Sequence, residues 1–390
     1  MQNHPADQEP RRVLGSFFAP KFQNTPTWEQ RKLGEVFEEY SEKNHAELPP
    51  LTIIQGGGTI RRDESERALQ YDKSSLSNYK MVNKDDFIVH LRSFEGGLEK
   101  ASSQGIISPA YHTFHGEDVD SRFYYAYFRS KNFINKDLKP HVYGIRDGRS
   151  IDIEGMKTIR IPWASYPEQK SIGDFLTHLD TLITLHQRKY EKLVNIKKSM
   201  LDKMFPQNGA SVPEIRFKGF TDPWEQRKLG DLCVEFRSGE FISASDITET
   251  GEYPVFGGNG LRGFTDRFNH DGEYTLIGRQ GALCGNVNFA VGKSYFTEHA
   301  IAVRADKKNQ TRFLYYLFST MDLGQYSGQS AQPGLAVGNL VELKSTLPDK
   351  QEQEKISGVL TALDTLITLH QRKLEKLQNI KKSCLEKMFV

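Results

Sequence analysis

Two segments of the sequence each occur twice, and this duplication limits the fold more than any other feature. The heptapeptide WEQRKLG occurs at 28–34 and again at 224–230. Residues 168–205 align with 352–389 at an offset of 184, and 28 of the 38 positions are identical. Because internal repeats mark repeated structural units, the chain is predicted to contain a variable body followed by a constant segment, twice over.

The two constant segments have the apolar spacing of paired helices. Apolar side chains recur at alternating intervals of four and three, and neither segment contains an internal proline. A helix of this length spans about 57 Å at about 1.5 Å per residue. We expect the two helices to form an antiparallel coiled coil with a pseudo-two-fold repeat. The seam positions are Ile172, Leu176, Leu179, Ile183, His186, Tyr190, Leu193, Met200 and Met204, and then Ile356, Leu360, Leu363, Ile367, His370, Leu374, Leu377, Cys384 and Met388, with Lys381 as a break.

The variable bodies predict mixed structure, so the expected fold class is α+β. Aromatic segments at 123–128 and 313–318 each predict a short helix, and the β-rich runs alternate with Gly and Asn turns. Examples of these runs are Leu51–Ile54, Asp86–Leu91, Glu273–Gly278 and Ala300–Arg304. The predicted organisation is an altered or disordered leader at 1–27, a domain at 28–166, a helix at 167–205, a linker at 206–223, a domain at 224–350 and a helix at 351–390.

Charge and cysteine usage argue against several classes of protein. The 52 Lys and Arg residues oppose 50 Asp and Glu residues, and the bodies at 35–166 and 231–350 carry net charges of −2 and −3. Neither body has the basic excess that is typical of a free-standing DNA-binding domain. The three cysteines are far apart and favour neither a disulfide framework nor a thiolate metal site. Since no apolar run is long enough to cross a membrane, we expect a soluble, cytoplasmic protein.

The sequence contains short patterns that resemble catalytic or metal-binding sites, but the segments around them lack the secondary structure or ligand spacing that such sites need. Gly258, Gly260 and Gly263 have the spacing of a nucleotide-binding loop, but no helix or βαβ unit is predicted around them, so a turn is the better interpretation. The eleven histidines form no metal-ligand pattern. His186 and His370 fall on the seams, where partly buried histidines with local hydrogen-bond partners are expected. The sequence therefore indicates neither an enzyme nor a bound metal.

Polar and planar side chains set among glycines are the remaining candidates for function. Arg, Asn and Gln make bidentate contacts to base edges, and glycine lets a backbone come close to a groove. Ordinary solvated turns are the alternative interpretation. The candidate DNA-contacting residues are Arg61, Arg62, Arg92, Ser93, Tyr111, Tyr143, Arg146, Arg149, Asn259, Arg262, Arg279, Gln280, Gln329 and Gln332.

The constant segments resemble those of the specificity subunit of type I restriction-modification systems. The similarity rests on WEQRKLG before each body and on LDTLITLHQRK-x-EKL-x-NIKKS after it, and 272–287 and 327–353 resemble that family's target-recognition domains. The resemblance implies two target-recognition domains separated by the antiparallel helices. Each domain would read one half of a bipartite, asymmetric DNA target, and the chain would carry no catalytic residue.

The resemblance also implies partners. Two methyltransferase subunits, which bind S-adenosylmethionine and methylate adenine, would assemble on the chain with restriction and translocase subunits that use ATP and Mg, while the chain itself would bind no cofactor. Two alternatives stay open: a coiled-coil interaction scaffold without DNA specificity, and the recognition portion of a fused methyltransferase-nuclease. The outward-facing residues expected to contact the methyltransferases are Arg188, Lys192, Arg372 and Lys376.

Overall fold

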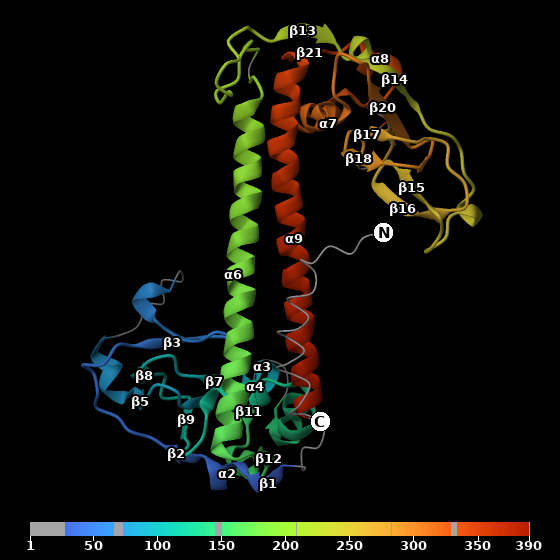
Figure 1. The fold of residues 1–390 in the computed structure, drawn as a ribbon. Helices are drawn as coiled ribbons and strands as arrows, with labels where there is room; N and C mark the ends of the chain where they lie inside the picture. Colours follow the sequence, from blue (N-terminus) through green and yellow to red (C-terminus); the bar gives the residue numbers. More distant parts are fainter. Residues whose placement is uncertain are drawn as a thin grey trace. The chain divides into compact units, whose positions relative to one another are not determined.

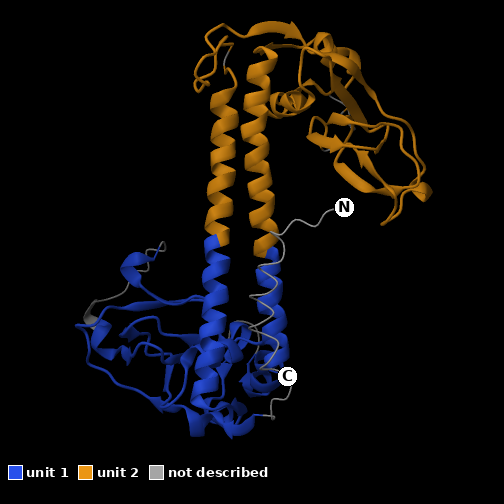
Figure 2. Cartoon of the chain, viewed as in Figure 1, with its two compact units in different colours: residues 1–185, 375–390 blue, residues 186–374 orange. Residues whose placement is uncertain are grey.

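The chain forms two compact units (Figure 2). The structure is a computed structural model that describes residues 28–65, 73–144, 150–207, 209–281, 283–328 and 334–389. Unit 1 is Met1–Leu185 together with Glu375–Val390, and unit 2 is His186–Leu374. The long helices α6 (Tyr166–Met204) and α9 (Lys350–Met388) each contribute one part to unit 1 and the other part to unit 2.

Unit 1 contains a four-stranded antiparallel sheet in the order β2-β9-β6-β7 (Figure 1). Antiparallel two-stranded ladders join β1 with β12, β3 with β4, β5 with β8 and β10 with β11. The strands are β1 (Glu29–Lys32), β2 (Glu38–Tyr40), β3 (Leu51–Ile54), β4 (Gly58–Arg61), β5 (Lys80–Val82), β6 (Phe87–Val89), β7 (Glu99–Lys100), β8 (Gly105–Ile107), β9 (His112–His115), β10 (Val142–Tyr143), β11 (Ser150–Ile151) and β12 (Arg160–Trp163). The short helices are α2 (Leu33–Val36), α3 (Ser93–Gly96), α4 (Ser121–Phe128) and α5 (Ile153–Lys157), with 3-10 or π turns at Arg62–Glu64, Lys73–Asn78, Phe133–Leu138 and Lys139–His141.

Unit 2 contains a four-stranded antiparallel sheet in the order β14-β20-β17-β18 and a three-stranded sheet in the order β16-β15-β19. The strands are β13 (Glu225–Lys228), which pairs with β21 (Lys344–Leu347), and β14 (Cys233–Ser238), β15 (Tyr253–Gly257), β16 (Gly260–Thr265), β17 (Glu273–Gly278), β18 (Val287–Val291), β19 (Tyr295–Phe296) and β20 (Ala300–Ala305). The helices are α7 (Thr311–Thr320) and α8 (Val337–Glu342), with 3-10 turns at Gly230–Leu232, Ala244–Asp246 and Leu323–Tyr326. The two aromatic helices predicted from the sequence are confirmed as α4 and α7.

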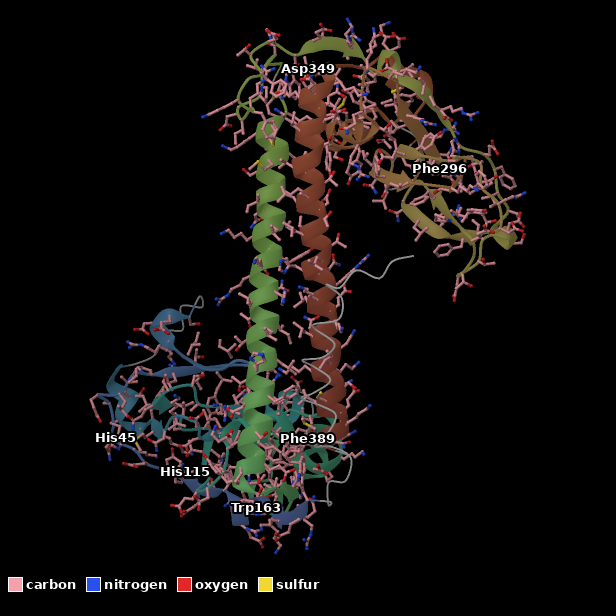
Figure 3. All side chains as sticks on the ribbon, in the orientation of Figure 1. His45, His115, Trp163, Phe296, Asp349 and Phe389 are labelled. Carbon is pink, nitrogen blue, oxygen red and sulfur yellow. The ribbon has the colours of Figure 1, made fainter. Side chains whose placement is uncertain are left out.

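Each body is closed by the start of one long helix and the end of the other. In unit 1, Ile172 and Leu176 of α6 and Phe389 just after α9 join the apolar core, and Figure 3 labels Phe389 in this position. In unit 2, Ile356 and Leu360 of α9 and Phe205 just after α6 play the same part. These repeated apolar contacts fix each body on its helices, because buried aromatic rings contribute a large share of core packing.

The long helices run antiparallel within each unit. In unit 1 the ammonium of Lys381 pairs with Asp180, and in unit 2 Lys197 pairs with Asp364 at 2.6 Å. These two ion pairs are equivalent positions of the repeat. They explain the break in the predicted seam, since Lys381 reaches a carboxylate on the facing helix and needs no apolar partner.

A buried glutamine links each long helix to its body. The Oε1 of Gln169 accepts the backbone N–H of Asp120 at the start of α4, and its Nε2 donates to the carbonyl of Ala164. In unit 2, Gln353 accepts the N–H of Gln310 at the start of α7 and donates to the carbonyl of Pro348. These bonds satisfy helix-terminal groups that would otherwise be buried without partners, so the frame under both bodies is the same.

Candidate nucleic-acid interface

In unit 2, three glycine-rich loops meet at the ends of β17 and β20. A side chain at Gly258 would come within 2.8 Å of the carbonyl of His299, and one at Gly278 would come within 2.4 Å of the carbonyl of Gly258. The N–H of Leu335 donates to the carbonyl of Arg279 at 2.8 Å, which brings in the third loop. Glycine is required at 258 and 278 because only a residue without Cβ allows this approach.

These contacts bring together several residues that the sequence singled out. Asn259 and Arg262 are exposed on the β15–β16 hairpin, which confirms a turn at the GxGxxG spacing. Arg279 is half-buried, and its guanidinium donates to the carbonyl of Glu298 at 3.4 Å. Gln280 is exposed, and its Oε1 lies 2.9 Å from Nδ1 of His299. Gln329 and Gln332 lie outside the described residues.

Sequence reasoning missed three residues of this cluster. Glu298 and His299 lie directly before β20, where each bonds to Arg279, and Asn288 lies beside Gly260. The Oε2 of Glu298 and the Nδ2 of Asn288 are buried and have no hydrogen-bond partner within the described ranges. Buried polar atoms are normally satisfied, so Glu298 and Asn288 each retain one polar atom that a further partner would bond. No local motif signals them, since they depend on strand pairing.

In unit 1, a buried carboxylate positions the glycine-rich loop between β3 and β4. Glu99 is fully buried, and its two oxygens accept the N–H groups of Gly56 at 2.6 Å and Gly58 at 3.1 Å. Tyr125 donates its hydroxyl to the same carboxylate at 2.7 Å, and Arg129 forms an ion pair with it. Burial, together with the Glu99 carboxylate, raises the pKa of Tyr125, so the phenol remains a hydrogen-bond donor.

The predicted contact residues Arg61 and Arg62, at the end of β4, have partners within the chain. Arg61 is exposed and pairs with Asp63 at 2.7 Å. The guanidinium of Arg62 lies 5.3 Å from the ring centroid of Tyr79 and donates to the carbonyl of Leu51. Arg61 is therefore presented to solvent, whereas Arg62 supports the local packing.

A second cluster of unit 1 surrounds His90. Burial lowers the pKa of His90, and its Nε2 has no hydrogen-bond partner in the described part of the chain. The ring of His90 packs edge-on against Tyr111, and a small cleft next to it is lined by Leu91 and Ala110. Arg92 is exposed at the start of α3.

Ser93 requires a correction to the predicted set of contacts. Its side chain has 0% exposure, and its hydroxyl accepts the N–H of His90, so it shapes the turn and is not available to a ligand. Tyr143 is 59% exposed on β10, and Arg146 and Arg149 lie outside the described residues. The four residues predicted to contact partner subunits are all exposed on the long helices: Arg188, Lys192, Arg372 and Lys376.

The described residues contain neither a metal-ligand cluster nor a membrane-spanning helix. They hold no group of three or more His, Cys, Asp or Glu side chains that could bind a metal ion. None of the described helices is both long and apolar enough to cross a membrane.

Comparison with known proteins agrees with this duplicated architecture. The family model for the type I restriction modification DNA specificity domain matches residues 26–195 and again 221–379. The type I restriction enzyme EcoprrI specificity subunit of Escherichia coli is 41% identical over 174 residues, which are 44% of this chain and 42% of that protein. The putative MjaX specificity subunit of Methanocaldococcus jannaschii is 23% identical over 390 residues and 91% of each chain.

A solved structure shares the fold. The type I restriction-modification S subunit from M. genitalium superimposes with a TM-score of 0.67 at 16% identity, over 95% of this chain and 98% of that one. The chain therefore belongs to the type I restriction modification DNA specificity family. Within that family it is a DNA specificity subunit, the non-catalytic part of the enzyme complex.

Proposed function

We propose that the two bodies read the two halves of a bipartite, asymmetric DNA target. This proposal rests on one observation. The two bodies are supported by the same structural elements but differ in the loops that those elements carry. The same strand pair, buried glutamine and helix-end phenylalanine support each body. The loops on that frame differ, since unit 1 offers Arg61 and Arg92 and unit 2 offers Asn259, Arg262 and Gln280. Two readers with different side chains recognise different sequences.

The charge of the two bodies indicates that partner subunits would also have to contact the DNA. The bodies carry net charges of −2 and −3, so phosphate contacts, which dominate affinity, would have to come largely from partners. We propose that two methyltransferase subunits bind on the exposed helix faces that carry Arg188, Lys192, Arg372 and Lys376. In this proposal S-adenosylmethionine, ATP and Mg are held by the methyltransferase and restriction subunits and none by this chain.

Methylation mapping tests the proposal. The subunit would be expressed with its cognate methyltransferase subunit in cells that lack other adenine methylation, and every methylated adenine would be located. The expected motif has two different half-sites separated by unread base pairs. A continuous or palindromic motif would contradict the two-reader proposal, and methylation without a motif would favour a scaffold role.

A further inference from the structure

His299 lies between a carboxylate and an amide in the loop cluster of unit 2. Its Nε2 is 3.2 Å from Oε1 of Glu298, and its Nδ1 is 2.9 Å from Oε1 of Gln280. The backbone N–H of Arg279 donates to the carbonyl of His299 at 2.9 Å, which holds the two strand ends in register. The hydrogen-bonding state of the imidazole Nδ1 therefore determines which atom of the exposed Gln280 amide faces outward.

Counting hydrogens gives two arrangements of this chain of groups. An ionised carboxylate only accepts, so the carboxylate of Glu298, 3.2 Å from Nε2 of His299, favours the neutral tautomer that carries its hydrogen on Nε2. When the imidazole is neutral, Nδ1 is an acceptor, so the amide of Gln280 turns its NH₂ inward and presents its oxygen outward. When the imidazole is protonated, Nδ1 donates to Oε1 of Gln280, and the NH₂ group faces outward. The two amide orientations occupy the same volume.

We propose that His299 is a positioning residue that sets which base Gln280 selects, an inference that rests on the proposed reading of DNA by unit 2. Adenine presents a donor and an acceptor in the major groove, and guanine presents two acceptors. With His299 neutral, the outward oxygen and remaining N–H of Gln280 match adenine. With His299 protonated, Gln280 offers its NH₂ group first and matches guanine.

A carboxylate and a guanidinium lie close to His299 and are both charged at neutral pH. The carboxylate of Glu298 lies 3.2 Å from Nε2 of His299, and the guanidinium of Arg279 donates to the carbonyl of Glu298 at 3.4 Å. The thiol of Cys284 donates to the carbonyl of Arg279 at 3.2 Å, on the strand end that bonds to His299. The side chain of His299 is 41% exposed, so it exchanges protons with solvent directly.

The test uses the full chain with its methyltransferase subunits and a DNA library randomised in the half-site read by unit 2. Selection would be run at about pH 8 and about pH 6, a range in which histidine ordinarily changes charge. At one position we expect adenine at the higher pH and a shift of about tenfold toward guanine at the lower pH. The half-site read by unit 1 serves as the internal control.

Two variants separate positioning from simple structural support. In Glu298→Gln, the new amide can turn to accept from or donate to Nε2 of His299, so the imidazole is no longer held in one tautomer and the preference for adenine at the higher pH should weaken. In His299→Ala, the preference at this position should no longer depend on pH. If neither pH nor Glu298→Gln changes the selected base, the inference about His299 is wrong.

Gln280→Ala distinguishes failure of the inference from failure of the proposed function. Loss of preference at a single position supports Gln280 as a reader and leaves His299 to be judged by the variants above. An unchanged motif would overturn the positioning role together with base contact by Gln280. The absence of any selected motif with the unaltered chain would overturn the proposed DNA reading itself.

Discussion

Trp28 and Trp224 begin the same seven-residue segment but are bonded differently. The indole N–H of Trp28 donates to Glu168 at 3.1 Å, whereas that of Trp224 has no partner among the described residues. Glu352, the repeat equivalent of Glu168, instead accepts two bonds of 2.8 Å from Arg216. In unit 2 the carboxylate therefore bonds to the guanidinium of Arg216 and not to the indole of Trp224.

The packing around the two tryptophans is nevertheless the same. Trp28 contacts Phe123 and Phe389, and Trp224 contacts Phe313 and Phe205, at centroid distances between 5.2 and 6.1 Å. The comparison shows that apolar packing maintains the frame of both bodies. The polar bonds at its edge adjust to whichever partner the local sequence provides.

Removing the helix-end phenylalanines should have the largest effect. Phe389→Ala and Phe205→Ala each leave a cavity in an aromatic core, which costs about 3–5 kcal/mol. The effect should be local, with faster amide hydrogen exchange in α4 for Phe389→Ala and in α7 for Phe205→Ala. Equal acceleration in both helices by either variant would contradict the separate packing of the two units.

Truncating the two glutamates should have the next largest effect on stability, and that effect should differ between the two units. Glu352→Ala leaves Arg216, which is 15% exposed, without its partner, and breaking such a buried pair costs about 3 kcal/mol. Glu168→Ala removes one hydrogen bond between the indole N–H of Trp28 and a carboxylate, worth about 1.5 kcal/mol, and leaves no charged group without its partner. Denaturant unfolding of both variants, with Glu352→Gln as the matched control, measures the difference. A larger loss from Glu168→Ala would reverse our comparison.

The loop clusters can be compared through one arginine from each. Arg279→Ala should weaken binding by about 1–3 kcal/mol and relax only the half-site read by unit 2, and Arg92→Ala should do the same for the other half-site. Binding of the assembled complex to targets with single base changes measures this. If both half-sites weaken equally, the arginine is a phosphate contact or a structural group.

A smaller effect is expected from pH at the helix seam. The Nδ1 atoms of His186 and His370 are 2.8 Å apart. Burial lowers the pKa of both, and the ammonium groups of Lys189 and Lys373 lower it further. Because the folded state holds these rings neutral, stability present above the ordinary histidine pKa of about 6.5 should fall as the pH drops below it.

Thermal unfolding between about pH 8 and about pH 5 measures this dependence. The double variant His186→Gln/His370→Gln removes both titrating rings, so its unfolding temperature should change less with pH. An equally steep change in that variant would assign the pH dependence to other groups, such as the buried His90.

The interhelical ion pairs should have the smallest effect. Asp180→Ala removes a partner of Lys381 from a pair that is largely exposed, which costs about 0.5 kcal/mol. Asp364→Ala should cost somewhat more, since Asp364 also accepts the hydroxyl of Tyr316 at 2.8 Å. Unfolding at low and high salt tests the pairs, because added salt should reduce the difference between Asp180→Ala and the unaltered chain. A salt-independent difference would rule out an electrostatic role.

The sequence predicted the parts of the fold that depend on local spacing. The seams of α6 and α9, the helices α4 and α7 and strand β17 all follow from periodicity or composition within one segment. The bonding of Glu99 to a loop 43 residues away, and of His299 to Gln280, depends on strand register that one sequence does not reveal. The sequence also does not reveal that Ser93 is buried whereas its neighbour Arg92 is exposed.

The return of α9 to unit 1 sets an order of events during synthesis. The body of unit 1 is translated early, but Leu385, Met388 and Phe389, which complete its core, follow the whole of unit 2. At about 5–20 residues per second, the wait is roughly 10–40 s. During that interval Trp28, Phe123 and Tyr127 lack the ring of Phe389 that packs against them, so nascent unit 1 should depend on chaperones for longer than unit 2 does.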